Sequence, residues 1–223
     1  MPDEPLLDAV ESEPRESPSL AVIWLHGLGA DAHDFAPIVD ELDLEFPIRF
    51  VFPHAPVRPV TINGGLRMRA WYDILGWAED APEDASGIGA SAAAIARLID
   101  REVERGLDTT RVVLAGFSQG GAIALHTALR EPRSLAGVIA LSTYLPLADD
   151  VSTERSAANR EAPILMVHGT ADPVIPIAHA VASRRVLEGL GYAVEWHEYA
   201  MGHAVCGSEI AAIAGWLSRL AAR

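Results

Sequence analysis

The sequence predicts an α/β fold with a mostly parallel, doubly wound sheet and helices on both faces, and two observations support this prediction. Short apolar runs alternate with longer amphipathic segments along almost the whole chain of 223 residues. These runs are apolar at successive positions, so both faces of each strand are expected to be buried. Strands of this kind, separated by helices, form parallel sheets that helices cover on both sides. No repeat or low-complexity linker interrupts the pattern, and we expect one domain over residues 1–223.

The individual elements follow from the same pattern. Residues 1–19 are rich in Glu, Pro and Ser, and they predict an edge strand at Leu6–Val10 followed by a loop. The sheet strands are expected at Leu20–Trp24, Ile48–Phe52, Arg111–Ala115, Gly137–Leu141, Ile164–Val167 and Val194–Tyr199. The helices are expected at Phe35–Leu42, Ile88–Arg105, Gly120–Arg130, Ala178–Leu190 and Glu209–Leu220. Ser86 and Ser208 are the expected caps of the second and the last helix.

Composition excludes several classes of function. The formal net charge is −14, which would repel a phosphate backbone, so we expect no nucleic-acid partner. Cys206 is the single cysteine, which excludes an intrachain disulfide and a cysteine-based zinc site. The apolar runs are too short to span a bilayer, and residues 1–7 lack the basic start and long apolar stretch of a secretory signal. We therefore expect a cytoplasmic protein with no stable membrane insertion.

The strongest local signal is the segment Gly116–Gly120, which reads Gly-Phe-Ser-Gln-Gly. It follows an apolar strand and leads directly into a helix, as a G-x-S-x-G nucleophile elbow requires. In such an elbow the serine adopts a strained backbone conformation, and the flanking glycines avoid collisions with the neighbouring strand and helix. The helix N-terminus beneath the serine favours developing negative charge. The pattern predicts Ser118 as a nucleophile, although a chance match to so short a motif is the plain alternative.

A serine hydroxyl needs a base, and the base needs an orienting acid. In α/β-hydrolases these follow the serine in the order acid, then histidine. Asp172 lies in the turn after one expected strand, and His203 lies in the loop after the last strand, so both fall at carboxyl ends of strands. Taken alone, Asp172 could be an ordinary Asp-Pro turn residue, and His203 could be an ordinary loop histidine. The other histidines fit less well, because they lie within helices or strands or precede the acid: His26, His33, His54, His126, His168, His179 and His197.

The turn after the first central strand reads His-Gly-Leu-Gly from His26. Such a turn supplies one backbone donor of an oxyanion hole, and the residue after the nucleophile supplies the other. We assign these donors to the N–H groups of Leu28 and Gln119. Other chemistries lack support: His197 and Glu198 begin a zincin-like motif that Met201 breaks, and the glycine pattern of a dinucleotide site fails at Ala32. We expect no metal and no cofactor.

Several longer segments resemble the phospholipase/carboxylesterase family, which includes bacterial carboxylesterases and acyl-protein thioesterases. The segments that carry the resemblance are Trp24–Asp31, Gly116–Ala122 and His168–Pro176, and those most similar to the bacterial carboxylesterase branch are Pro53–Pro56, Val60–Gly65 and Met68–Ile74. The likeness extends from about Leu20 to the C-terminus, whereas Glu11–Ser19 matches no motif of the family.

The resemblance implies an α/β-hydrolase fold, the same Ser118, Asp172 and His203, and an acyl pocket formed partly by the long loop after Pro53. We place Ile74, Leu75 and Trp77 in that pocket, although apolar loop residues also serve plain packing. The chain leaves little room for a large lid domain. We therefore expect a serine carboxylesterase that acts on a small-molecule ester or other acyl substrate of short to medium chain length.

Three questions stay open from sequence. The same site suits an acyl-protein thioesterase or a lysophospholipase. A catalytically silent binding protein of the same fold is the remote alternative, because such proteins usually lose a member of the triad and here all three residues are present. Apolar loop residues would also allow a homodimer.

Overall fold

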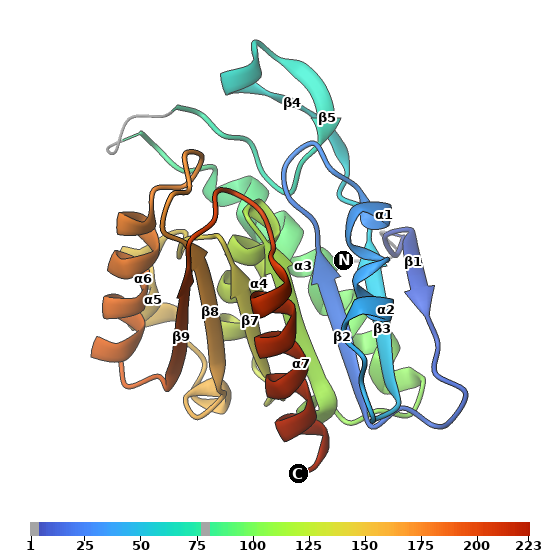
Figure 1. The fold of residues 1–223 in the computed structure, drawn as a ribbon. Coiled ribbons are helices and arrows are strands. Elements are labelled where there is room, and N and C mark those ends of the chain that lie inside the picture. Colours follow the sequence, from blue (N-terminus) through green and yellow to red (C-terminus); the bar gives the residue numbers. More distant parts are fainter. Residues whose placement is uncertain (1–4, 77–80) are drawn as a thin grey trace.

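The central feature of the fold is a seven-stranded sheet, seen in a computed structural model that describes residues 5–76 and 81–223 (Figure 1). Its strands are β1 (Ala9–Ser12), β2 (Leu20–Leu25), β3 (Ile48–Pro53), β6 (Val112–Phe117), β7 (Gly137–Leu141), β8 (Ile164–Gly169) and β9 (Val194–Tyr199). Their order across the sheet is β1-β3-β2-β6-β7-β8-β9. Strand β1 runs antiparallel to β3, and all the other pairs are parallel. The predicted doubly wound, mostly parallel sheet is confirmed.

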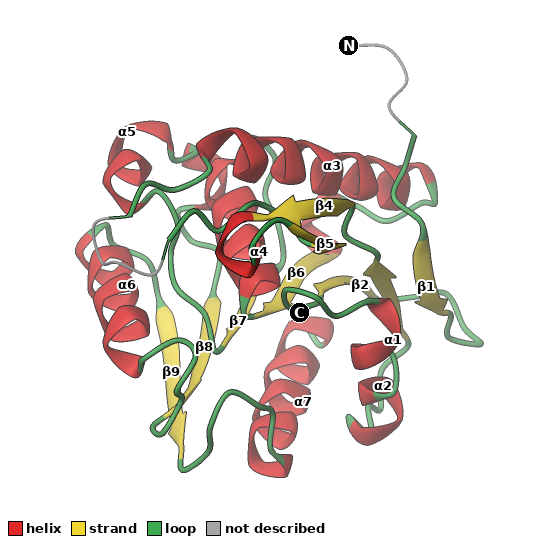
Figure 2. Ribbon diagram, turned by 90° about the horizontal axis from the view of Figure 1, so that it is seen from above, coloured by secondary structure: helices red, strands yellow, loops and turns green. Residues whose placement is uncertain are grey.

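Helices cover both faces of this sheet (Figure 2). They are α1 (Ala32–Phe35), α2 (Ile38–Glu41), α3 (Ala85–Glu104), α4 (Gln119–Arg130), α5 (Val151–Glu154), α6 (Ile177–Gly189) and α7 (Gly207–Ala221). Short 3₁₀ helices lie at Thr61–Asn63, Thr109–Arg111, Ala148–Asp150 and Ala157–Asn159. Helices α3, α4 and α6 pack on one face, and α1, α2 and α7 pack on the other. None of the helices within the described ranges is long and apolar enough to cross a bilayer.

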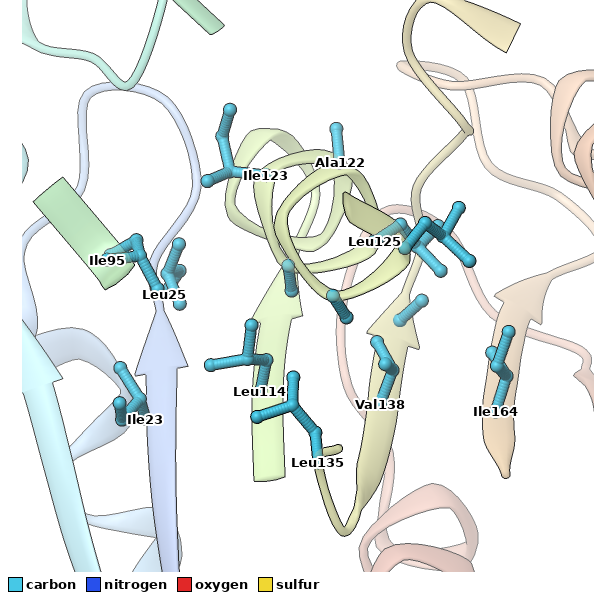
Figure 3. Close-up of a cluster of buried hydrophobic side chains, with 14 of the residues drawn as sticks. Ile23, Leu25, Ile95, Leu114, Ala122, Ile123, Leu125, Leu135, Val138 and Ile164 are labelled. Carbon is cyan, nitrogen blue, oxygen red and sulfur yellow. The ribbon is translucent and has the colours of Figure 1, made fainter. Parts of the chain in front are cut away.

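Alternate residues of each strand enter opposite cores, which explains why the strands are apolar throughout. Leu114 of β6 joins the core beneath α3 and α4, whereas its neighbours Val113 and Ala115 face α7 on the other side. Figure 3 shows the first of these cores, where strand side chains such as Leu114 and Val138 lie beneath residues of α4. The sheet is therefore held from both sides and presents its strand ends as a rigid platform.

The strand order places a topological switch between β2 and β6. From β2 the chain passes to β3, which lies between β2 and the N-terminal strand β1, and it then crosses to β6 on the other side of β2 and continues outward through β9. Loops after adjacent strands diverge at such a point, so ligands of open α/β sheets bind there. The loops that follow β2 and β6 are the turn beginning at His26 and the elbow at Ser118. The sequence alone did not reveal that these two strands are neighbours.

The N-terminal edge is fastened to the sheet by ion pairs. The expected edge strand is shifted toward the C-terminus, because β1 begins at Ala9 rather than Leu6. Beyond it, Glu13 accepts a 2.9 Å hydrogen bond from Arg49 on β3, and Arg49 also binds Glu102 on α3 at 2.7 Å. Glu102 is fully buried and also pairs with Arg101 and Arg105. A buried carboxylate with several guanidinium partners joins β1, β3 and α3 in one network.

A β-hairpin was missed in the long loop after Pro53. Strands β4 (Val57–Val60) and β5 (Leu66–Arg69) pair antiparallel and form a separate two-stranded sheet beyond the carboxyl ends of β2 and β3 (Figure 1). Gly64 and Gly65 have φ angles of 66° and 79°, which residues without a Cβ adopt at little cost. The Asn-Gly-Gly run at 63–65 was the available signal for this turn.

Three predictions about how the helices begin are wrong. The predicted helix Phe35–Leu42 is two short helices, because Pro37 has no N–H to continue the first and instead opens α2. Ser86 is not the cap of α3: Asp84 caps it and accepts a bond from the N–H of Gly87 at 2.8 Å. Ser208 is not a cap either, because α7 begins at Gly207 and Cys206 is its N-cap, so Ser208 lies within the helix.

Candidate active site

The backbone of the elbow has the strained geometry expected of it. Ser118 lies between β6 and α4 with φ 55° and ψ −122°, a conformation that is rare for a residue with a side chain. A Cβ on Gly116 would overlap the backbone of Gly120, and a Cβ on Gly120 would overlap the carbonyl groups at the end of β2. The two glycines thus permit the strand, the turn and the helix to approach closely, and the serine side chain is directed away from the sheet.

The structure brings Ser118, His203 and Asp172 together in one hydrogen-bonded row. Nε2 of His203 lies 2.9 Å from Oγ of Ser118, and Nδ1 of His203 lies 2.7 Å from Oδ2 of Asp172. The carboxylate of Asp172 thus holds Nδ1 of the imidazole, and Nε2 is directed at the serine hydroxyl. Ser118 is 8% exposed and Asp172 is 7% exposed. The acid is therefore shielded, whereas the imidazole between them is partly open to solvent.

The loops that carry the acid and the histidine are joined to each other. The N–H of Thr170 donates to the carbonyl of Tyr199 at 2.8 Å, and the N–H of Ala171 donates to the carbonyl of Met201 at 3.1 Å. Gly169 completes the contact, because a Cβ there would overlap the carbonyl oxygens of residues 201 and 202. Backbone contacts between the ends of β8 and β9 therefore set the distance between Asp172 and His203.

Asp172 is kept ionised by its surroundings. Burial alone would raise the pKa of this carboxyl, but the hydrogen bond from His203 and those from backbone N–H groups lower it below its usual 3.8. Those N–H groups belong to Ile175 and Val174 and lie 2.9 and 2.8 Å from Oδ1. A carboxylate that stays charged at neutral pH can accept a hydrogen bond from Nδ1–H of the imidazole and stabilise the charged form of the ring.

The two expected oxyanion donors are free. Among the residues that the structure describes, neither the N–H of Leu28 nor that of Gln119 donates a hydrogen bond, whereas the next N–H along the turn, at Gly29, binds the carbonyl of Arg69 at 2.9 Å. The turn also lies against the elbow, since a Cβ on Gly27 would be 3.5 Å from Cβ of Ser118. Two unpaired donors thus occur in the two segments that flank the serine.

Two polar side chains brace this turn, and sequence reasoning gave neither of them that role. Nε2 of His26 accepts from the N–H of Ala55 at 3.0 Å, so Nδ1 carries the proton and donates to the carbonyl of Gly27 at 2.7 Å. The side chain of Gln119 binds the N–H of Trp71 and the carbonyl of Tyr72, both at 2.8 Å. A buried histidine and a buried glutamine at strand ends were the signals that could have found these contacts.

Other contacts steady the elbow from the opposite side. Oγ1 of Thr143, just beyond β7, donates to the carbonyl of Ser118 at 2.6 Å. The ring of Phe117 packs on the imidazole of His203 with centroids 4.7 Å apart. A polar pair directly after an apolar strand, at Ser142 and Thr143, was a usable signal for the first contact. No sequence pattern indicated the second.

The residues assigned to an acyl pocket are only partly placed. Ile74 is half-buried and packs against the core beneath α3 and α4, whereas Leu75 is 40% exposed. Trp77 lies outside the described residues. Within residues 5–76 and 81–223, no group of three His, Cys, Asp or Glu side chains is arranged to hold a metal ion.

Comparison with known proteins identifies the family of this chain. Residues 8–221 match the model of the phospholipase/carboxylesterase family. The chain is 40% identical to acyl-protein thioesterase 1 of Neurospora crassa over 211 residues, which are 88% of this chain and 85% of the relative. It also resembles the crystal structures of SOBER1 from Arabidopsis thaliana and acyl-protein thioesterase 2 from Zea mays, with 30% and 29% identity and TM-scores of 0.86 and 0.85. The alignments cover 90% and 96% of this chain and 98% and 99% of those chains. The chain therefore belongs to the phospholipase/carboxylesterase family of α/β-hydrolases.

Proposed function

We propose that this protein is a serine hydrolase that cleaves acyl esters through a covalent acyl-enzyme, with Ser118 as nucleophile, His203 as general base and Asp172 as the acid that orients the base. The observation that carries the proposal is the row of two short contacts, 2.9 Å from the serine to the imidazole and 2.7 Å from the imidazole to the carboxylate. At the first distance a base can take a proton from a nucleophile, and at the second a carboxylate can orient that base.

The proposed reaction has two matched halves. Nε2 of His203 takes the hydroxyl proton of Ser118 as Oγ attacks the acyl carbon, and the tetrahedral oxyanion accepts hydrogen bonds from the N–H groups of Leu28 and Gln119. Each such donor is worth about 3 kcal/mol of transition-state stabilisation. The imidazolium then returns its proton to the leaving alcohol as the bond to the acyl carbon breaks. Water repeats the sequence in the alcohol's place and releases the acid and the free serine.

We further propose that the preferred substrates are small esters with short to medium acyl chains. No large lid covers the carboxyl ends of the strands within the described residues, and the hairpin β4–β5 lies beyond them together with connecting loops (Figure 1). Leu75 offers an exposed apolar side chain for an acyl group, and Ile74 supports it from the core.

A thioester substrate is the second candidate. Relatives from Neurospora crassa and Schizosaccharomyces pombe, 40% and 37% identical to this chain, are both named acyl-protein thioesterase 1. The same nucleophile and oxyanion donors would serve a thioester, because the acyl carbon is attacked in the same way and only the leaving group differs. A lysophospholipid would react at its single acyl ester by the same steps.

The test is steady-state hydrolysis of p-nitrophenyl butyrate, the matching butyryl thioester and a lysophosphatidylcholine by the wild type and by Ser118→Ala. Ser152→Ala, an exposed serine on α5, is the matched control. Loss of the hydroxyl should lower kcat by about 10⁴-fold or more, while the control keeps full activity. Equal activity of wild type and Ser118→Ala on every substrate would refute the proposed nucleophile, and the ranking of kcat/KM values decides between ester and thioester.

A further inference from the structure

The proposed reaction leaves one buried histidine beside the site without a role. His168 lies near the end of β8, four residues before Asp172, and is 1% exposed. Its Nε2 lies 2.8 Å from the carbonyl oxygen of Ile175 and 3.5 Å from Oδ2 of Asp172. A carbonyl oxygen can only accept, so Nε2 carries a hydrogen. That N–H donates to Ile175 and lies close to the carboxylate oxygen that His203 contacts.

His168 acts here as a neutral donor rather than as a second charge. Burial lowers the pKa of His168, and the bond to the carbonyl of Ile175 and the charge of Asp172 oppose this lowering only in part. The other titratable groups that face it are His203 and, on β9, Glu198. A neutral imidazole keeps its Nε2 hydrogen across the neutral pH range and adds no competing positive charge beside His203.

The contacts form a closed loop around the acid. Both backbone groups of Ile175 are bound, because its N–H donates to Oδ1 of Asp172 at 2.9 Å and its carbonyl accepts from His168. The turn at residues 172–175 is therefore fixed to β8 by a side chain as well as by its own backbone. Rotation of the carboxylate would break the bond to Ile175 and move Oδ2 away from His203.

We propose that His168 is a positioning residue for Asp172, which holds the 172–175 turn so that Oδ2 stays aligned with Nδ1 of His203. The inference rests on the proposed serine-hydrolase function. Misalignment of a supporting group by about 1 Å can lower a rate about 100-fold. The consequence should appear in kcat, because the alignment stabilises the imidazolium formed during the reaction and touches no part of the substrate.

The kinetic test compares His168→Leu and His168→Gln in the hydrolysis of p-nitrophenyl butyrate. The leucine variant should lose about 10- to 100-fold in kcat, with KM changed by less than about threefold. The glutamine variant should recover kcat to within about fivefold of the wild type, because its amide can place a donor near the position of Nε2. His197→Leu is the matched control, since it makes the same change on the neighbouring strand β9 at a ring that is 36% exposed. Its kcat should stay unchanged.

A second readout does not depend on turnover. The Nδ1 proton of His203 should give a low-field ¹H NMR resonance, identified by its loss in His203→Asn, and His168→Leu should move or broaden it. If wild type hydrolyses none of the three substrates, the proposed function fails, but this resonance still tests the position of Asp172. If His168→Leu does not fold, His168→Asn replaces it, because its shorter side chain cannot reach Ile175. Values of kcat within twofold of wild type, together with an unchanged resonance, would overturn the inference.

Discussion

Glu209 allows a stability prediction whose size follows from the structure. It lies in the first turn of α7 and is fully buried. Burial raises its pKa from the usual 4.5 to about 7, and the backbone N–H of Cys206 offsets only part of that rise without completing a hydrogen bond to either oxygen. Since each pH unit between folded and unfolded pKa values is worth about 1.4 kcal/mol, the charged form costs about 3 kcal/mol of folding free energy above pH 7.

The sign of the pH dependence is the test of this account. Between pH 4.5 and 7 the folded chain retains a proton on Glu209 that the unfolded chain has released, so stability falls as pH rises through this range. Glu209→Gln removes the charge but buries an unpartnered amide, at a cost of about 1 kcal/mol. The variant should therefore be nearly as stable as wild type at pH 5.5 and about 2 kcal/mol more stable at pH 8.

Urea unfolding followed by tryptophan fluorescence at the two pH values measures this difference. Glu104→Gln, which makes the same change at an exposed position at the end of α3, is the control and should change stability by less than about 0.5 kcal/mol at either pH. A Glu209→Gln variant that is less stable than wild type at pH 8, or whose advantage is the same at both pH values, would show that the carboxylate is solvated or paired and would refute the reasoning.

Three further predictions concern other parts of the fold. Gly120→Ala should prevent stable folding or lower the free energy of unfolding by more than about 4 kcal/mol, because the new Cβ overlaps backbone atoms. Gly189→Ala, the control, has open space at the end of α6 and should leave stability unchanged or raise it by about 0.5 kcal/mol in thermal unfolding. Burial and a nearby arginine lower the pKa of His126 to about 4, so stability should fall by about 2 kcal/mol as pH drops from 6.5 to 4, and urea titrations of His126→Gln should show a flatter acid limb. Glu102→Gln leaves three arginine side chains without their buried partner and should lower the free energy of unfolding by about 3 kcal/mol. Glu11→Gln, at the rim of the same network, should lower it by less than about 1 kcal/mol. Similar urea midpoints for the two variants would argue against a buried ion-pair centre.

Much of the fold followed from local patterns because burial on both faces leaves a clear trace in a strand. The apolar runs at 48–52, 137–141 and 164–167 became β3, β7 and β8 with shifts of two residues or fewer. The elbow was predictable for a related reason: its glycines, its serine and its following helix are consecutive in the chain. The expected placement of Ser118, Asp172 and His203 at strand ends also agrees with the structure.

What the sequence did not show depends on contacts between distant residues. Ser86 is the cap that the sequence predicts for α3, but Asp84 caps it, because the second oxygen of Asp84 also accepts from the N–H of Asp73, 11 positions away. The bracing of the elbow by Gln119 likewise involves partners 47 and 48 positions distant. The hairpin β4–β5 is different, because its turn residues Asn63, Gly64 and Gly65 are consecutive and favour a tight turn on local grounds.

The adjacency of β2 and β6 has a consequence for how such a protein can diversify. Leu25 and Gly116 are opposite each other in hydrogen-bonded strands, so backbone spacing of about 4.8 Å holds together the two turns that follow. The segments proposed to contact the substrate, including residues 57–76, belong to neither strand. They can be lengthened, shortened or recomposed while the reacting groups keep their geometry. The reaction can therefore be conserved while the substrate specificity changes. Directed evolution toward new substrates should begin with libraries in residues 57–76.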